Sequence, residues 1–347
     1  MIRFTRAVMA TTSDLHVVET RPLVAPALLH GDLPIDAAAM ETVASARRRI
    51  QAILRGEDQR LLVVVGPCSV HDVKAAREYA QRLAPIRERL KDQLEVVMRV
   101  YFEKPRTTVG WKGLINDPHL DNSYDINTGL RRARGLLLDL AREGMPAATE
   151  LLDPVVPQYI ADLISWTAIG ARTTESQTHR EMASGLSMPI GYKNSTNGSA
   201  TIAINAMQAA GKPHHFLGIN RDGHASIVST TGNPYGHLVL RGGSQGSNYH
   251  LEAVQEAAAE LSQAGLQDRL MVDCSHANSN KDFRRQADVL ASVAEQLRGG
   301  SNHVMGVMIE SHLVEGNQKL NADLTQLTYG QSVTDACISL ETTEALL

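Results

Sequence analysis

Short apolar runs alternate with helical patterns from residue 61 to the end of the chain. The run Leu61-Leu62-Val63-Val64-Val65 is typical of a strand buried on both faces, as in a parallel sheet. Gly66 and Pro67 stop this strand and leave Cys68 at its carboxyl end. The same pattern predicts eight strands in all, at residues 61–65, 95–100, 147–152, 166–172, 189–194, 237–241, 270–274 and 304–309.

Segments with a helical period separate most of these strands. Residues 129–143, for example, place Leu130, Ala133, Leu137 and Leu140 on one face. Further helices are predicted at residues 74–90, 157–164, 177–186, 199–210, 251–264 and 282–297, and from Asp335 towards the end. Strands and helices in alternation, without a Rossmann glycine fingerprint, predict an α/β fold, a (β/α)8 TIM barrel.

Two segments do not fit the barrel repeat. Residues 1–34 contain scattered prolines and no period, and residues 36–54 have helical spacing, so residues 1–60 are expected to form an N-terminal arm and helix with oligomer or regulatory contacts. Residues 61–347 would be the catalytic barrel. Asn220-Arg221-Asp222-Gly223 between two apolar runs predicts a β-hairpin, inserted at about residues 213–236 before strand six.

Composition narrows the classes of function. A net charge of −4 over 347 residues argues against general affinity for nucleic acids or anionic membranes, which needs a basic face. No apolar run has the length of a membrane span or of a signal peptide core. Three cysteines are typical of a protein from a reducing compartment. We therefore expect a cytoplasmic protein with no membrane partner.

A reactive or charged side chain stands at or just after the carboxyl end of each predicted strand. The carboxyl ends of barrel strands carry the chemistry of this fold, so these side chains should meet at one mouth. Each of them alone has an ordinary structural explanation, such as a buried cysteine acting as a small apolar residue. A complete series is harder to explain in that way. Its members are Cys68, Arg99, Glu150, Arg172, Lys193, Arg241, His276 and Glu310.

The members of the series suggest two chemistries. Cys68, His276, Glu310 and the later Asp335 offer sulfur, nitrogen and oxygen donors, which suit one divalent Mn, Fe, Co or Zn ion better than Mg or Ca. The cations would repel one another without anions to hold, and two phosphorylated groups, or a phosphate and a carboxylate, would satisfy them. These cations are Arg99, Lys104, Arg106, Arg172, Lys193 and Arg241.

Two other enzyme chemistries are compatible with single motifs. Gly242-Gly243-Ser244-Gln245-Gly246 matches a nucleophile elbow, with Asp273 and His303 following in hydrolase order, although a phosphate-facing loop is the favoured interpretation. Lys193 could instead be the Schiff-base lysine of a metal-free lyase.

Long motifs resemble one known family over nearly the whole chain. They occupy residues 66–72 (GPCSVHD), 98–113 (MRVYFEKPRTTVGWKG), 169–177 (IGARTTESQ), 273–280 (DCSHANSN), 309–318 (IESHLVEGNQ) and 332–338 (SVTDACI). The chain is similar in these motifs to type I 3-deoxy-7-phosphoheptulonate synthase, the first enzyme of the shikimate pathway. It departs from the family at residues 192–198, where YKNSTNG replaces the usual FKNGTDG.

This resemblance implies an activity and a set of site residues. The family condenses phosphoenolpyruvate with erythrose 4-phosphate and releases phosphate. The resemblance places a metal on Cys68, His276, Glu310 and Asp335, with Lys104 as a further catalytic residue. It assigns phosphoenolpyruvate to Arg99, Lys104, Arg172, Lys193 and Arg241 with Glu150 nearby, and the aldose phosphate to Arg106 and Thr107. We also expect a homo-oligomer, either a dimer or a tetramer.

The resemblance also implies that the hairpin and the adjoining helix ends form a feedback pocket for an aromatic amino acid. Phenylalanine-sensitive relatives tend to carry Ser where this chain has Gly218, and Gly leaves room for a phenol hydroxyl, so we predict inhibition by tyrosine. A hairpin that serves only oligomer contacts, and a non-catalytic amino-acid-binding paralogue, are the alternatives. Positions that match the family's inhibitor pocket are Asp153, Pro157, Gln158, Ser187, Phe216, Gly218 and Val228.

Overall fold

Parallel strands close into a barrel in the computed structural model, which describes residues 12–106, 108–320 and 323–347. Each strand is hydrogen-bonded to the next, and the last pairs with the first, with Val63 opposite Val307. The eight predicted strands and the predicted (β/α)8 fold are therefore confirmed. The barrel strands are β1 (Leu61–Gly66), β2 (Leu94–Arg99), β3 (Ala147–Glu150), β4 (Trp166–Ile169), β5 (Ile190–Lys193), β8 (Gly236–Leu240), β9 (Leu270–Asp273) and β10 (Val304–His312).

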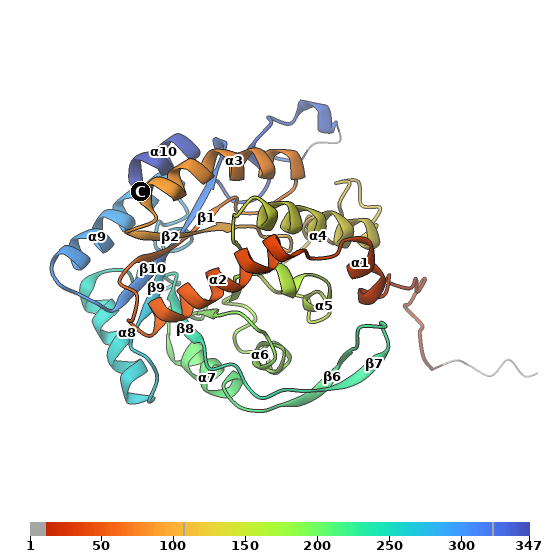
Figure 1. Cartoon of the computed structure of the whole chain (residues 1–347), viewed down its shortest axis with the longest axis horizontal. Helices are drawn as coiled ribbons and strands as arrows, with labels where there is room; N and C mark the ends of the chain where they lie inside the picture. The colour runs from red at the N-terminus through yellow and green to blue at the C-terminus, as the bar shows by residue number, and fades with distance from the viewer. Residues whose placement is uncertain (1–11, 107, 321–322) are drawn as a thin grey trace, which may run out of the picture.

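Helices surround this barrel on the outside (Figure 1). The two longest of them begin at aspartates that cap free backbone N–H groups, as Asp72 does for Lys74 at 2.8 Å and Asp125 for Thr128 at 3.2 Å. The surrounding helices are α3 (Val73–Leu90), α4 (Ile126–Arg142), α5 (Pro157–Ile160) continued by η1 (Ala161–Leu163), α6 (Gln177–Ser184), α7 (Thr201–Ala210), α8 (Leu251–Gln263), α9 (Gln286–Arg298) after η2 (Phe283–Arg285), and α10 (Leu340–Leu346).

The last predicted helix starts later than expected. Residues after Asp335 first form the short strand β13 (Ile338–Ser339), which pairs with the end of β10, and α10 begins only at Leu340. The connection after β10 also contains β11 (Val314–Asn317), η3 (Leu324–Gln326) and β12 (Gln331–Ser332). This pairing fixes the backbone near Asp335, which a helix starting there would have placed differently.

Helix α2 (Ala37–Leu54) lies across the amino-terminal end of the barrel (Figure 1). Its residues Ile50, Ile53 and Leu54 pack with Leu62 and Trp166 in a buried cluster at that end. Helix α2 therefore packs on the barrel of its own chain. With one end closed, the carboxyl ends of the strands remain available for a site.

The N-terminal arm contains a helix that the sequence pattern did not predict, α1 (Pro26–Asp32). Seven residues are too few to show a period. The arm touches two other elements: Ala27 N–H donates to the carbonyl oxygen of Arg221 at 2.8 Å, and the Tyr159 hydroxyl donates to that of Val24 at 2.7 Å. The arm thus links the hairpin tip to α5.

The predicted hairpin is confirmed as the antiparallel pair β6 (His215–Ile219) and β7 (Ala225–Ser229), which curves along the outside of α6 and α7 (Figure 1). Phe216 pairs with Val228 on a half-buried face. Leu217 pairs with Ile227 on the opposite face, where they are 90% and 76% exposed. One face of the hairpin therefore packs inward, and the other presents apolar side chains to solvent.

Within the described ranges, no helix is long and apolar enough to cross a membrane. The cytoplasmic location stays a prediction.

Candidate active site

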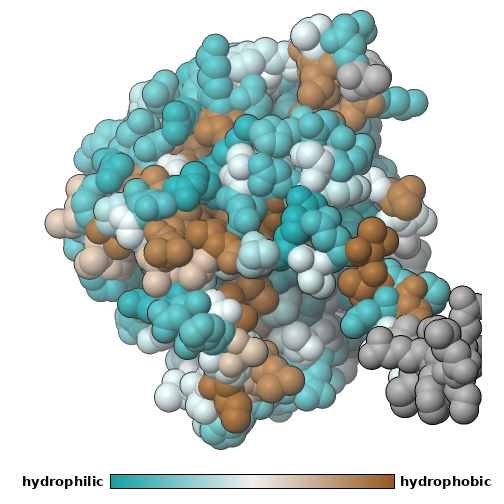
Figure 2. Space-filling model, turned by 90° about the vertical axis from the view of Figure 1, so that its right-hand side faces the viewer, coloured by the Kyte–Doolittle hydropathy of each residue, from teal (hydrophilic) through white to brown (hydrophobic). Residues whose placement is uncertain are grey.

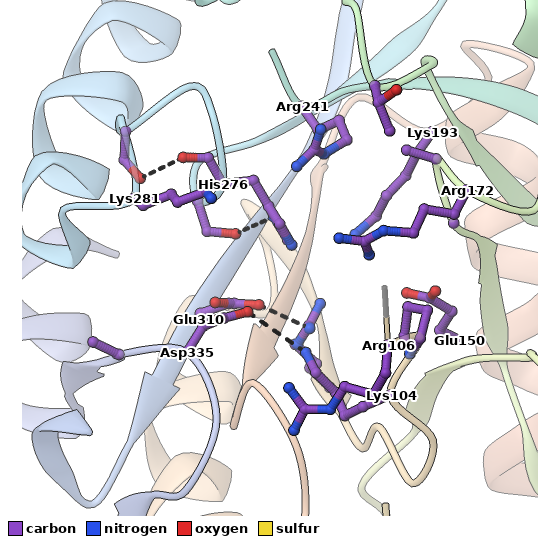
Figure 3. Close-up of a pocket in the computed structure, with 18 of the residues that line it drawn as sticks. Lys104, Arg106, Glu150, Arg172, Lys193, Arg241, His276, Lys281, Glu310 and Asp335 are labelled. Atoms are coloured by element: carbon purple, nitrogen blue, oxygen red, sulfur yellow. Dashed lines mark hydrogen bonds and ion pairs between the residues drawn. The ribbon is translucent and has the colours of Figure 1, made fainter. Parts of the chain in front are cut away.

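Side chains from the strand ends line a cavity of about 390 Å³ at the mouth of the barrel (Figure 3). Seven of the eight strand-end residues form its wall: Arg99, Glu150, Arg172, Lys193, Arg241, His276 and Glu310. The eighth, Cys68, is fully buried beneath the wall, and its Sγ lies 3.1 Å from Nζ of Lys104, which does line the cavity. Arg106 and Asp335 complete the predicted set there, and Thr107 lies outside the described residues.

Three of the four proposed metal ligands form a compact group. One donor atom each from Cys68, Glu310 and Asp335 lies within 4.8 Å of the others, and the Cys68 thiol donates to Asp335 Oδ2 at 3.5 Å. His276 lines the same cavity and lies outside this group. Burial, helped by the charge of Glu310, raises the pKa of Cys68 to about 11. A thiol beside two carboxylates is a suitable donor set for a divalent transition metal, and such a metal would displace the thiol proton of Cys68 on binding.

Arg99 is held rigidly at the floor of the cavity. It is 1% exposed, and its guanidinium lies 2.9 Å from Glu310 Oε1. It also donates to the carbonyl oxygen of Pro67 at 3.1 Å and stacks 3.5 Å from the centre of the Tyr101 ring. Although burial opposes its charge, Tyr101, Glu310 and Cys68 keep the pKa of Arg99 above its ordinary value. The fixed cation is thus oriented before any substrate binds.

Lys104 reaches the ligand group from the loop after β2. Its Nζ lies 3.7 Å from Asp335 Oδ2 in addition to its contact with Cys68. Burial lowers the pKa of Lys104, but Cys68, Glu310 and Asp335 outweigh that effect and raise it. For Asp335, burial raises the pKa, and the nearby charge of Lys104 outweighs this effect and brings it below the ordinary value. An ammonium therefore stands directly beside the donors.

The loop that carries Lys104 depends on one glycine. Lys104 N–H donates to the carbonyl oxygen of Lys112 at 2.9 Å, so the chain returns on itself. Gly113 has a φ of +116°, and a Cβ there would lie 2.0 Å from the Phe102 carbonyl oxygen. Only glycine permits this approach.

The remaining cations lie across the cavity from the ligand group. Figure 3 shows Glu310, Asp335, His276 and Lys281 on one side and Glu150, Arg172 and Lys193 on the other. Arg106 is oriented by the carbonyl oxygen of Trp111, to which its Nε donates at 2.8 Å. Burial lowers the pKa of Arg241 despite the nearby Asp273.

The sequence analysis missed Lys281 in this region and assigned Asp273 only to a hydrolase triad. Lys281 lines the cavity from the loop after β9, where its φ of +61° and that of His276, +58°, are unusual for residues other than glycine. Asp273 is fully buried, and its Oδ2 lies 3.0 Å from His276 Nδ1 and 3.2 Å from Lys193 Nζ. Burial would raise the pKa of Asp273, but these two partners hold it well below its ordinary value. The sequence feature that could have pointed to this role of Asp273 is an acidic residue at the end of a predicted strand, three residues before His276.

The hydrolase triad suggested by residues 242–246 is not assembled. His303 immediately precedes β10 and pairs with Asp268 at 3.4 Å, at the amino-terminal end of the barrel. Ser244 follows β8 at the carboxyl end, where its N–H donates to the carbonyl oxygen of Thr196 at 2.9 Å. These residues lie at opposite ends of the barrel, so the hydrolase interpretation is wrong.

None of the proposed inhibitor residues lines the mouth cavity in the part of the chain that the structure describes. The carbonyl oxygen of Gln158 lies 3.1 Å from His30 Nε2 of α1. The set comprises Phe216, Gly218 and Val228 on the inner hairpin face, Asp153, Pro157 and Gln158 after β3, and Ser187 after α6.

Comparison with known proteins identifies the relatives of this chain. The model of the DAHP synthetase I family matches residues 34–347. The Phe-sensitive phospho-2-dehydro-3-deoxyheptonate aldolase of Escherichia coli is 58% identical over 334 residues, which cover 96% of this chain and 95% of that protein. The Tyr-sensitive aldolase of the same organism is 54% identical over 335 residues, covering 96% and 94%. The structure of the aldolase from Francisella tularensis superimposes with a TM-score of 0.93 at 51% identity, covering 95% of this chain and 96% of that one. The chain therefore belongs to the DAHP synthetase I family.

Proposed function

We propose that the chain condenses phosphoenolpyruvate with erythrose 4-phosphate to 3-deoxy-D-arabino-heptulosonate 7-phosphate and phosphate, with one divalent metal ion (Mn, Fe, Co or Zn). As a member of its family, it is an enzyme of the first step of aromatic amino-acid biosynthesis. One observation carries the mechanism: seven cationic side chains share a cavity with three carboxylates, next to the group formed by Cys68, Glu310 and Asp335. Such a concentration of positive charge requires anionic substrates.

Phosphoenolpyruvate would occupy the inner part of the cavity. Arg99 and Lys193 are almost completely buried there, and Arg172 and Arg241 share their cavity. These groups suit the phosphate and the carboxylate of one small molecule, since arginine pairs with either in a bidentate manner. The aldose would lie nearer the ligand group with its phosphate towards Arg106 and Thr107.

Lys104 would stabilise the charge that develops during carbon–carbon bond formation. C3 of phosphoenolpyruvate attacks the aldehyde carbon, the aldehyde oxygen gains negative charge, and C2 becomes electron-poor. The Lys104 ammonium stands 3.1 Å from Cys68 Sγ, so it can donate to an oxygen placed beside the ligand group. The bound ion would supply Lewis-acid polarisation of the same aldehyde. Water then adds to C2, and the hemiketal phosphate expels phosphate.

Phosphate release from phosphoenolpyruvate tests this proposal. We expect release only with erythrose 4-phosphate present, loss of activity with a chelator, and recovery on addition of metal. Cys68→Ala and His276→Ala should be folded and inactive, while His303→Ala, at the other end of the barrel, should retain activity. Full turnover of either site variant in the presence of chelator would disprove the metal-dependent mechanism.

A Schiff-base lyase at Lys193 is the alternative chemistry. It would give a covalent adduct on Lys193 after borohydride treatment with substrate, and activity that survives chelation. A non-catalytic paralogue would bind an aromatic amino acid without releasing phosphate. The geometry favours neither, because Asp273 lies 3.2 Å from Lys193 and all six predicted cations line the cavity.

For regulation, we propose inhibition by tyrosine, bound between the inner hairpin face and α5. A Cβ at position 218 would lie 2.8 Å from Cγ2 of Val228, so a serine there would force Val228 to move, whereas Gly218 lets this side chain stay against β6. The Phe-sensitive relative is more similar overall, at 58% against 54%, and the proposal therefore rests on this position alone. Glu103 connects this region to the active-site loop, since its carboxylate accepts from Leu152 N–H at 3.3 Å and Asp153 N–H at 3.2 Å.

Assays with tyrosine, phenylalanine and tryptophan in turn test the choice of inhibitor. Tyrosine should inhibit the native enzyme, and Gly218→Ser should shift inhibition towards phenylalanine. Leu217→Ser, on the outward face of the same strand, is the control and should keep the native preference. Inhibition of the native enzyme by phenylalanine alone would refute the tyrosine proposal.

We also propose that the protein is a homo-oligomer, a dimer or a tetramer. Leu217 and Ile227 form an exposed apolar pair on the hairpin, and the N-terminal arm exposes Val18 completely and Leu15 by 65%. Figure 2, which looks onto the side where α1 and the hairpin tip lie, shows hydrophobic residues in several patches between hydrophilic ones. Contact with a second copy would cover such patches.

A further inference from the structure

Asp273, the last residue of β9, carries a fully buried carboxylate that faces two residues of the proposed site. Its Oδ2 lies 3.0 Å from His276 Nδ1 and 3.2 Å from Lys193 Nζ. Its Oδ1 accepts hydrogen bonds from the backbone N–H of Ser275 at 3.0 Å and from the Ser275 hydroxyl at 2.6 Å. A single carboxylate oxygen therefore touches both a proposed metal ligand and a proposed phosphoenolpyruvate-binding cation.

The contacts of Ser275 determine which nitrogen of His276 carries hydrogen. The Ser275 hydroxyl donates its hydrogen to Asp273, because an ionised carboxylate only accepts. The oxygen of that hydroxyl lies 2.8 Å from His276 Nδ1, so it can only accept there. Asp273 Oδ2, 3.0 Å from the same nitrogen, favours hydrogen there as well because it is negatively charged. Nε2 of His276 consequently keeps its lone pair, which is the form that binds a metal.

The same carboxylate balances the charge of Lys193. This lysine is 3% exposed, and Asp273 is the one carboxylate within ion-pair distance of it among the described residues. A buried ammonium without such a partner is costly. Asp273 thus sets where the ammonium lies before a substrate phosphate arrives.

We propose that Asp273 is a positioning residue that acts through His276 and Lys193 and couples metal affinity to phosphoenolpyruvate affinity. The inference rests on the proposed function of those two residues. When a phosphate engages Lys193, Oδ2 is left with His276 as its main partner and polarises the Nδ1–H more strongly. Nε2 then becomes a better donor, so metal and phosphoenolpyruvate bind with positive cooperativity, which linkage makes reciprocal.

Binding of Co²⁺ to chelator-treated, dialysed protein tests this coupling without any activity measurement. The absorbance of the cobalt–thiolate complex reports the affinity. Asp273→Asn should bind Co²⁺ roughly 10–100-fold more weakly than the native protein. Phosphoenolpyruvate should increase the native affinity for Co²⁺ by roughly 5-fold or more, and this increase should be absent from the variant. Calorimetry without metal should show weaker phosphoenolpyruvate binding by the variant.

Asp162→Asn is the matched control, because it removes a charge from an ion pair with the buried Arg134 outside the cavity. It should bind Co²⁺ with native affinity. Native Co²⁺ affinity in folded Asp273→Asn, or an equal loss in Asp162→Asn, would overturn the inference. Failure of the native protein to bind Co²⁺ would instead contradict the proposed metal-dependent function.

A measurement on the native protein avoids any variant that does not fold. The ¹⁵N chemical shifts of the His276 ring, assigned by comparison with His276→Gln, report the tautomer. Hydrogen on Nδ1 is expected in the metal-free protein near neutral pH. Hydrogen on Nε2 would overturn the inference.

Discussion

Removal of the Glu310 charge should destabilise the metal-free protein strongly. Arg99 and Glu310 are 1% and 2% exposed and lie 2.9 Å apart, so Glu310→Gln leaves a buried guanidinium without its counter-charge. Breaking a buried pair in this way costs roughly 3–5 kcal/mol. Arg99 keeps its contacts with the Pro67 carbonyl oxygen and the Tyr101 ring, so we expect a loss of about 3 kcal/mol, at the lower end of that range.

Urea unfolding in the presence of chelator measures this loss of stability. The urea concentration at the midpoint of unfolding should fall, while the dependence of the unfolding free energy on urea stays unchanged. Chelation matters because Glu310 is also a proposed metal ligand. The double variant Arg99→Met with Glu310→Leu replaces the pair by apolar groups and should recover most of the loss. Glu57→Gln, which removes a charge from the exposed pair with Arg55, is the control and should leave the midpoint unchanged. If Glu310→Gln behaved like Glu57→Gln, or if the double variant lost as much stability as Glu310→Gln, the reasoning would be refuted.

Four further outcomes are expected. Because burial raises the pKa of the Cys68 thiol to about 11, metal binding must release the thiol proton, and the apparent metal affinity should rise about tenfold per pH unit between pH 7.5 and 9. Calorimetry in buffers of different ionisation heat measures this proton release, and a metal affinity that does not depend on pH would contradict the prediction. Lys104→Met should lower kcat roughly 100–1,000-fold in steady-state assays while the protein stays folded, and a near-native kcat would exclude its role beside the aldehyde. Leu217→Asp combined with Ile227→Asp should reduce the molar mass seen by light scattering; an unchanged mass would remove the hairpin from the interface. Ile50→Ala should lower the free energy of unfolding by about 2–5 kcal/mol in a denaturant titration, because this side chain is fully buried at the closed end of the barrel. A loss below about 1 kcal/mol would mean that α2 contributes little to the core.

The sequence alone determined the barrel. Strands buried on both faces leave long apolar runs, and helices with one buried face leave a regular period, so local patterns identified each barrel strand and most helices. It also determined which residues would meet, because the carboxyl ends of parallel strands lie at one rim whatever their distance along the chain. Helix α1 was missed, and α10 was placed too early, because a short helix has no readable period and because β13 pairs with β10 through a contact distant in sequence.

Only the tertiary structure decided how the site residues act on one another. Cys68 and Asp335 are separated by 267 positions, and their 3.5 Å contact follows from packing that no local pattern records. The place of Asp273 between His276 and Lys193 was likewise invisible in the sequence, where Asp273 suggested only a hydrolase triad. The physical reason is that burial and charge pairing depend on distances between side chains from different strands, whereas the periodicity of a sequence reports only which face of its own element each residue occupies.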